Sequence, residues 1–255
     1  VKLCNRNFGI GADGMIAVVP STKADFRMRI FNSDGSEAEM CGNGTRCAVK
    51  FFVDYVMESS SKPAASGSTL DIAVETLAGI RTVSAEFKDG TVSMMTVNMG
   101  APILKPSEIP VSVDSEPALD VGIEAAGRSF SANCVSMGNP HAVILIDDPV
   151  ESFDVARFGS VIEKHSLFPK KTNVEFVNVL SDRELRMRVW ERGVGETFAC
   201  GTGTCATVVA MNLAGKCGRE AVVHLLGGDL TIRWADSGDV FMTGPAETVF
   251  EGETK

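Results

Sequence analysis

Residues 191–214 read ERGVGETFACGTGTCATVVAMNLA, in which Cys200 precedes a Gly-Thr-Gly turn and a nearly apolar run. Residues 32–52, NSDGSEAEMCGNGTRCAVKFF, repeat the pattern with Cys41 before a Gly-Asn-Gly turn. In both copies a glutamate lies four residues before the cysteine, and a second cysteine followed by alanine comes after the turn. The repeat predicts a duplicated half-domain in which each copy presents one thiol to a shared site.

The bulk composition restricts the class of protein. At 255 residues, the chain is long enough for one large domain or two ordinary ones with a substantial core. A net charge of −9 disfavours a nucleic-acid partner or an anionic membrane surface, both of which need clustered lysine and arginine. No apolar run approaches the length of a membrane span, and no secretory segment opens the chain. Seven cysteines, an odd number, then indicate reduced thiols in a cytoplasmic protein.

The apolar runs after the two turns predict one central helix in each half. In the first copy we expect a helix over Thr45–Met57, and because it is apolar on most faces it should be buried nearly all round. Another helix is expected over Phe153–His165. The remaining alternating or apolar runs predict strands at residues 15–20, 25–32, 70–76, 79–87, 91–100, 129–135, 142–146, 173–179, 185–190, 221–226, 229–235, 239–246 and 247–252.

These elements divide into two halves, each with several strands and one buried helix. A Pro/Ser/Gly-rich linker occupies residues 62–69, and a proline-punctuated crossing begins near residue 98. We expect an N-terminal half of residues 1–98 plus 246–255, which contains Cys41. The C-terminal half is expected at residues 99–245, which contain Cys200.

The position of each cysteine at a helix start gives it a specific chemistry. Unpaired N–H groups and a partial positive charge at a helix N-terminus favour a thiolate, so the pKa of such a thiol is expected below its free value. The flanking glycines let backbone N–H groups approach a carboxylate closely. Two such turns acting on one carbon would invert a stereocentre next to a carboxylate, one thiolate removing the α-proton and the opposite thiol returning one.

Other readings of the glycine and cysteine patterns are weaker. The glycine-rich residues 7–14 (NFGIGADG) follow no predicted strand and open no helix, so a dinucleotide loop is disfavoured. The cysteine spacings in both copies exceed those of usual zinc sites, and no metal is expected. Cysteine is often a core residue, and five of them are expected to serve packing: Cys4, Cys47, Cys134, Cys205 and Cys217.

Four segments resemble the diaminopimelate epimerase family, and they occur in the family's order over essentially the whole chain. They are FNSDGSEAEMCGNGTRC at 31–47, SMGNPH at 136–141, TNVEF at 172–176 and ERGVGETFACGTG at 191–203. The resemblance implies an α+β fold of two pseudo-symmetric domains, each a curved, mostly antiparallel sheet wrapped around a central helix. It also implies interconversion of LL- and meso-diaminopimelate without pyridoxal phosphate or another cofactor, in lysine and peptidoglycan precursor biosynthesis.

The resemblance assigns roles to residues at the matching motif positions. The implied catalytic residues are Cys41 and Cys200 as acid–base groups, with His141 and Glu191 assisting them. The implied substrate-binding residues are Asn32, Gly42, Asn43, Asn139, Asn173, Glu191, Arg192, Gly201 and Thr202. His165 and His224 match no motif and are expected at the surface or in packing. Glu37 and Glu196 are expected to be structural and to brace the turn before each helix.

Departures from the family pattern leave alternatives open. The chain lacks the family's opening strand and Gly-Asn-Asp-Phe segment, which predicts weak or no activity for these residues alone. Phe250 stands where some members have a tyrosine linked to dimer formation, and a homodimer is still expected. The rival functions are a two-cysteine racemase acting on histidine or proline, a non-catalytic thiol redox protein, and a metal-binding module.

Overall fold

The computed structural model describes residues 1–38, 41–63 and 65–253. Parts of the expected first motif, linker and C-terminal range lie outside the described residues, at Glu39, Met40, Ala64, Thr254 and Lys255.

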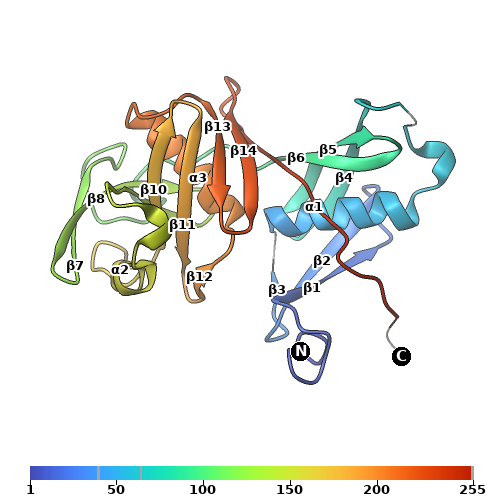
Figure 1. Cartoon of the computed structure of the whole chain (residues 1–255), viewed down its shortest axis with the longest axis horizontal. Coiled ribbons are helices and arrows are strands. Elements are labelled where there is room, and N and C mark those ends of the chain that lie inside the picture. The colour runs from blue at the N-terminus through green and yellow to red at the C-terminus, as the bar shows by residue number, and fades with distance from the viewer. Residues whose placement is uncertain (39–40, 64, 254–255) are drawn as a thin grey trace. The chain divides into compact units, whose positions relative to one another are not determined.

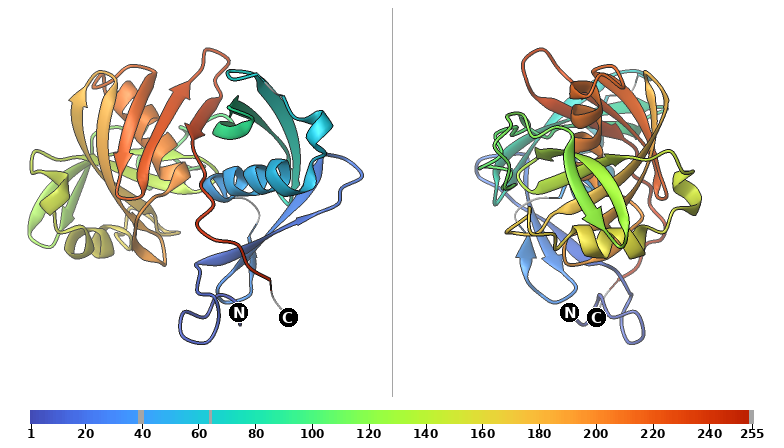
Figure 2. Two further views of the ribbon diagram at one scale, coloured as in Figure 1. Left: turned by 45° about the vertical axis from the view of Figure 1, so that its right-hand side comes forward. Right: turned by 90° about the vertical axis from the view of Figure 1, so that its left-hand side faces the viewer.

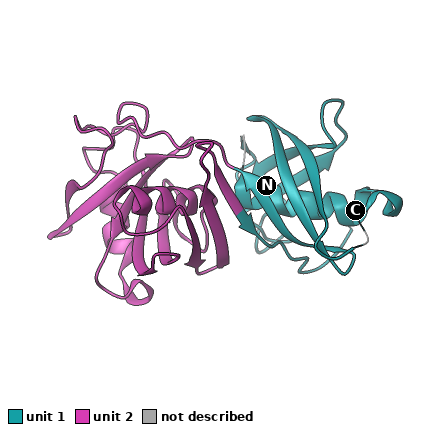
Figure 3. Ribbon diagram, turned by 90° about the horizontal axis from the view of Figure 1, so that it is seen from above, with its two compact units in different colours: residues 1–98, 243–255 teal, residues 99–242 magenta. Residues whose placement is uncertain are grey.

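Two compact units divide the chain. One comprises Val1–Asn98 with Thr243–Lys255, and the other comprises Met99–Met242 (Figure 3). The chain therefore enters the second unit after Asn98 and returns within strand β15 (Val240–Gly244). Both units combine a mostly antiparallel sheet with a central helix, so the α+β class expected from the sequence is confirmed.

The strands of the first unit follow the order β1-β2-β4-β5-β6, with the short strand β3 beside β2 (Figure 1). Neighbours are antiparallel, except that β2 and β4 are parallel. In β2 the buried residues Phe26, Met28 and Ile30 alternate with more exposed ones, so one face of this strand packs on the core. The strands are β1 Gly14–Val19, β2 Phe26–Asn32, β3 Glu37–Ala38, β4 Thr69–Thr76, β5 Gly79–Lys88 and β6 Thr91–Asn98.

Helix α1 (Gly42–Phe51) packs against β1, β2, β5 and β6 and continues as a π-helical turn, Phe52–Val56. A 3-10 turn follows at Ser59–Ser61. The helix expected over Thr45–Met57 is present, but its start and its burial nearly all round were predicted wrongly. The helix starts at Gly42, and Tyr55 is 49% exposed, because the sheet of this unit covers only one helix face.

The second unit has the strand order β14-β13-β11-β10-β9-β8-β7, with β12 beside β11 and β15 beside β14. Two neighbouring pairs are parallel, β9 with β10 and β11 with β13. The strands are β7 Val121–Ala125, β8 Arg128–Ser136, β9 Pro140–Leu145, β10 Asn173–Ser181, β11 Glu184–Glu191, β12 Gly195–Thr197, β13 Glu220–Leu225 and β14 Gly228–Trp234.

Helix α3 (Gly201–Leu213) is the central helix of the second unit, and here the expected burial is confirmed. It lies within the curve of the sheet (Figure 2) and packs against strands β8, β9, β10, β13 and β14. Residues 203–211 are all buried. The small side chains of α3 let the sheet approach it closely. The buried threonine hydroxyls of the helix form hydrogen bonds. Thr204 Oγ1 donates to the Cys200 carbonyl at 2.7 Å, and Thr207 Oγ1 contacts Met187 Sδ at 3.0 Å.

The other face of this sheet carries a second core with helix α2. This helix spans Val155–Ile162, within the expected Phe153–His165, and Asp154 caps it by accepting from Arg157 N at 3.1 Å. A 3-10 turn, Val150–Ser152, precedes it. Four phenylalanine rings form the centre of this core: Phe130, Phe153, Phe158 and Phe176. None of the helices in the described part of the chain is long and apolar enough to cross a membrane.

Each unit has an arginine–glutamate ion pair between two strands shortly before its cysteine. Glu37 on β3 is paired with Arg29 on β2 at 2.9 Å, and Glu196 on β12 is paired with Arg188 on β11 at 2.7 Å. In both units a short strand therefore pairs with a long one and is tied to it by an arginine–glutamate ion pair. This agrees with the expected bracing role of the two glutamates.

The strand expected at residues 247–252 is absent. These residues belong to the first unit and run as irregular chain beside helix α1. Side-chain contacts hold them instead of a β ladder: Arg46 Nε donates to the Pro245 carbonyl at 3.2 Å, and the Tyr55 hydroxyl donates to Glu251 Oε1. The prediction was wrong because an apolar alternation alone does not supply a sheet edge with which to pair.

Candidate active site

Cys200 is the residue before the first turn of helix α3, with an extended backbone (φ −126°, ψ 109°) and a buried side chain. Burial, followed by the negative charges of Glu191 and Glu175, raises the pKa of its thiol well above the usual value. Cys200 is therefore a neutral thiol at neutral pH. The sequence prediction of a lowered pKa was wrong for this residue, because desolvation and two carboxylates outweigh the favourable helix end.

A connected set of polar side chains leads from Cys200 into the core of its unit. Thr202 Oγ1 lies 3.5 Å from Cys200 Sγ and accepts from Asn139 Nδ2 at 3.3 Å. Asn139 Oδ1 lies 3.0 Å from His141 Nε2, and His141 Nδ1 lies 2.7 Å from Glu175 Oε1. The structure thus joins three of the predicted residues to Cys200 and adds Glu175.

Glu175 is the functional candidate that the sequence analysis missed, although it lies within the quoted TNVEF segment. It is fully buried, and its atom Oε2 has no hydrogen-bond partner among the described residues. Burial raises the pKa of its carboxyl, against the lowering effect of His141. The available signal was a charged residue inside an otherwise apolar strand run, since acidic side chains are almost never fully buried without a partner.

Glu191, Arg192 and Asn173 lie at the adjacent strand ends. Thr197 Oγ1 donates to Glu191 Oε1 at 2.5 Å, which orients this carboxylate. The buried Asn173 side chain donates to the Pro140 carbonyl at 2.8 Å and accepts from Arg192 N at 2.8 Å. Asn173 therefore fixes the backbone of Arg192, whose side chain is exposed.

In the first unit, Cys41 occupies the equivalent position before helix α1. Its backbone is extended (φ −144°, ψ 116°), its sulfur accepts from Gly44 N at 3.4 Å, and its side chain is exposed. Asn43 Oδ1, in the first turn, is buried without a hydrogen-bond partner among the described residues. Asn32 is exposed at the end of β2, and its Nδ2 donates to Ser36 Oγ at 2.9 Å.

The predicted site residues thus form two groups, each defined within its own unit. Gly42 is buried in the first turn of α1, as Gly201 is in the first turn of α3. The two remaining histidines lie apart from these turns. His224 lies between Asp229 and Glu184, 2.8 Å from each, and His165 Nδ1 accepts from Leu167 N. In the described ranges, no group of three or more His, Cys, Asp or Glu side chains could hold a metal ion.

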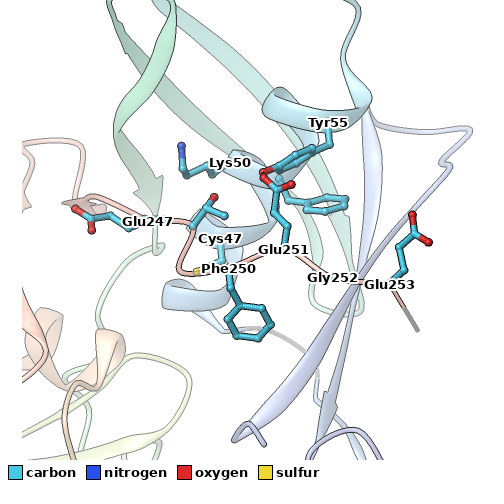
Figure 4. Close-up of a pocket in the computed structure, with 11 residues that line it drawn as sticks. Cys47, Lys50, Tyr55, Glu247, Phe250, Glu251, Gly252 and Glu253 are labelled. Atoms are coloured by element: carbon cyan, nitrogen blue, oxygen red, sulfur yellow. The ribbon is translucent and has the colours of Figure 1, made fainter. Parts of the chain in front are cut away.

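A cavity of about 740 Å³ lies in the first unit, between helix α1 and residues 246–253 (Figure 4). Cys47, Lys50 and Tyr55 line it from the helix side, with Phe250 and Glu251 opposite. The expected packing role of Cys47 was wrong, because this residue lies on the helix face that the sheet leaves uncovered and is exposed. Neighbouring side chains still desolvate its thiol enough to raise its pKa.

This exposure predicts the order in which the thiols react. Brief treatment of the native chain with N-ethylmaleimide should modify Cys41 and Cys47, and the reaction at Cys47 should accelerate as the pH is raised toward its elevated pKa. Peptide mass spectrometry measures the modification at each site. Cys205, buried in the equivalent helix, is the matched control and should react only after unfolding. Protection of Cys47 in the native chain would contradict this arrangement.

Sequence comparison finds one family over both units. The family model described as diaminopimelate epimerase matches residues 1–105 and 133–249. The chain is 51% identical to the diaminopimelate epimerase of Desulfitobacterium hafniense over 251 residues, 98% of this chain and 85% of that one. It is 51% identical to the diaminopimelate epimerase of Methanococcus maripaludis strain C5 over 250 residues, 98% and 87% of the two chains.

Solved structures of low sequence identity share the fold. A probable proline racemase from Agrobacterium radiobacter K84 matches with a TM-score of 0.66 at 15% identity, covering 98% of this chain and 80% of that one. A PhzF-family phenazine biosynthesis protein from Bacillus anthracis matches with a TM-score of 0.61 at 18% identity, covering 92% and 82%. At these identities the likeness concerns the fold alone.

Proposed function

The chain belongs to the diaminopimelate epimerase family of isomerases, and from this premise we propose that it interconverts LL- and meso-diaminopimelate at the α-carbon by a two-cysteine mechanism without pyridoxal phosphate. The observation that carries the proposal is the repeated element. In each unit a cysteine precedes the central helix and is followed by Gly-x-Gly, with an ion-paired glutamate ahead of it. A packing role explains a buried cysteine, but it does not explain this repetition.

The first turns of the two helices are proposed to bind the reacting carboxylate. Gly42 and Asn43 would supply backbone N–H groups from α1, and Gly201 and Thr202 would supply them from α3. The first N–H groups of a helix have no partner within the helix, and each helix end stabilises an anion by up to about 2 kcal/mol. This contribution also stabilises the carbanion that forms beside the carboxylate.

The two thiols are proposed to move the protons. Because Cys200 rests as the thiol, it is the donor in one direction and Cys41 is the base. The Cα–H bond breaks as its proton passes to the Cys41 thiolate, and the Cys200 proton forms a new Cα–H bond on the opposite face. Cys41 ends as the thiol and Cys200 as the thiolate, from which the reverse reaction begins. His141 and Glu191 are proposed to assist these transfers.

The distal amino-acid end of the substrate is proposed to lie against Asn32, Asn139, Asn173, Glu191 and Arg192. Both hydrogen bonds of the Asn173 amide are to backbone atoms, and the one from Arg192 N holds the Arg192 backbone in place. The exposed Arg192 guanidinium donates from Nη1 to the Lys170 carbonyl at 3.2 Å, and its remaining N–H groups are suited to a carboxylate.

The cellular setting follows as part of the same proposal. We place the reaction in the cytoplasm, in lysine and peptidoglycan precursor biosynthesis, and we propose a homodimer. Exposed apolar side chains on one part of the first unit support the dimer: Phe51, Tyr55, Val56, Val249 and Phe250. A single monomeric species in sedimentation equilibrium would contradict it.

Isotope exchange tests the activity directly. The complete gene product, incubated with LL-diaminopimelate in D2O under reducing conditions and without pyridoxal phosphate, should exchange the α-proton and form the meso isomer. Proton NMR measures the exchange, and chiral chromatography measures the isomer. Lack of exchange by the folded product would reject the proposal.

The same assay separates the rival functions. L-proline and L-histidine should show no exchange, whereas exchange with either would indicate a racemase of another substrate. A redox protein would instead form a disulfide between Cys41 and Cys200 without exchanging any substrate, which peptide mass spectrometry after mild oxidation detects.

A further inference from the structure

We propose that Glu175 is a positioning residue that sets the direction of the hydrogen-bond chain ending at Cys200, so that the Thr202 hydroxyl donates to the Cys200 sulfur. The inference rests on the proposed function for its catalytic consequence. Its structural basis is the continuous path from Glu175 through His141, Asn139 and Thr202, in which successive polar atoms lie 2.7, 3.0, 3.3 and 3.5 Å apart.

The Asn139 amide fixes the direction of the middle of this chain. Its Nδ2 faces Thr202 Oγ1, so its Oδ1 faces His141 Nε2. An amide oxygen only accepts, and therefore His141 Nε2 carries a hydrogen. Because Asn139 donates to one lone pair of Thr202 Oγ1, the Thr202 O–H is left free to donate to Cys200.

The burial of Glu175 explains why His141 holds a proton on Nε2. His141 and Glu175 are both fully buried, and Glu175 Oε2 has no hydrogen-bond partner among the described residues. A pair with a net negative charge is costly in such a place, whereas a neutral pair is not. Neutrality requires two protons on the pair. One shared between Nδ1 and Glu175 Oε1 leaves the other for Nε2, where the Asn139 amide demands it, whereas a proton on Oε2 would have no acceptor among the described residues.

The charged groups around the His141–Glu175 pair also favour its neutral form. Glu175 on β10 is faced by His141 from β9 and is influenced by Glu191 from β11. The thiols of Cys134 on β8 and Cys200 on α3 lie close enough for Glu175 to raise the pKa of each. No cation other than His141 balances Glu175 among these groups, so an ionised Glu175 depends on His141 alone.

The first turn of α3 is shaped for this carboxylate. A Cβ atom at Gly203 would lie 2.5 Å from Glu175 Oε1 and 3.3 Å from Cys200 Sγ. The carboxylate and the sulfur thus both approach one point that only glycine leaves free. This gives the second glycine of the Cys-Gly-Thr-Gly sequence a role separate from binding a substrate anion.

Replacing Glu175 with glutamine tests the direction of the chain. A glutamine amide offers either its oxygen or its nitrogen to His141 Nδ1, so both neutral tautomers of His141 become equally acceptable. Asn139 then turns in part of the molecules, and Thr202 donates to it instead of to Cys200. Since about half of the molecules then keep the active arrangement, we expect kcat to fall by about twofold. KM should stay near the wild-type value. The pH limb that reports Cys200 thiolate formation should move to higher pH in Thr202→Val, which loses the hydroxyl donor and keeps the charge of Glu175.

Three variants and one spectroscopic signature make the test specific. Thr202→Val removes the hydroxyl donor from every molecule and should lower kcat by at least about tenfold, the size of one hydrogen bond to a charged group. Glu175→Gln should then cause little further loss in that background, because both act through one hydroxyl. Glu151→Gln, which removes an exposed carboxylate from the same unit, should behave as wild type. Nitrogen NMR should show His141 with hydrogen on Nε2 in the wild type and a mixture of tautomers in Glu175→Gln.

Distinct outcomes would overturn the inference. A wild-type kcat and pH profile in folded Thr202→Val would do so, as would losses that simply add in the double variant. An unchanged His141 tautomer in Glu175→Gln would also reject it. The NMR measurement needs no turnover, so a failure of the diaminopimelate assay with the expected tautomer change would reject the proposed function alone.

Discussion

Replacing Cys200 with alanine should reduce epimerisation by at least about a hundredfold, because alanine can neither donate nor accept the proton that one face of the α-carbon requires. Cys41 remains in this variant, and it still removes and returns the proton of the isomer that it reaches. We therefore expect α-proton exchange in D2O for one isomer without inversion. Chiral chromatography and proton NMR on the same sample separate the two outcomes.

The matched control lies in the same helix. Cys205 is fully buried on α3, so Cys205→Ala should lower stability while the folded fraction keeps its epimerase activity. If Cys200→Ala retained most of the activity, or exchanged and inverted both isomers, the two-cysteine mechanism would be rejected.

Replacing Phe176 with alanine should lower the free energy of unfolding of the second unit by about 3–5 kcal/mol. Phe176 is fully buried on β10, and its ring centroid lies 4.7 Å from that of Phe153 and 6.2 Å from that of Phe130. Truncation removes these ring contacts and leaves a cavity that the surrounding strands cannot fill. Urea unfolding followed by tryptophan fluorescence measures the change, since Trp190 packs against the same core.

Phe198 supplies the control of identical chemistry. Its ring is 75% exposed in the same unit, so Phe198→Ala should change the free energy of unfolding by no more than about 0.5 kcal/mol. Equal effects of the two substitutions would contradict the packing described for the phenylalanine core.

Local sequence patterns predicted much of the fold because the relevant physics acts over a few residues. Alternation marked strands such as β2, and the Cys-Gly-x-Gly sequences marked the region in which α1 and α3 start, although each helix begins at the glycine directly after its cysteine. The errors occurred where the outcome depends on distant parts of the chain. Residues 247–252 alternate like a strand, yet whether they pair depends on an available sheet edge.

Some residues of the candidate site were also predictable from local sequence, whereas another was not. The sequence singled out Cys41 and Cys200 as candidates from their repeated context, since a helix start and a glycine turn are local properties. It did not identify Glu175, whose partner His141 is 34 residues away and meets it only because β9 and β10 are adjacent parallel strands.

What the sequence by itself determined is therefore the pair of cysteines directly before the two central helices and the family to which they point. Only the tertiary structure decided the protonation state of Cys200, the exposure of Cys47 and the burial of Glu175. A pKa depends on the solvent and charges within a few ångströms of a group, and these are supplied by strands and helices remote in sequence.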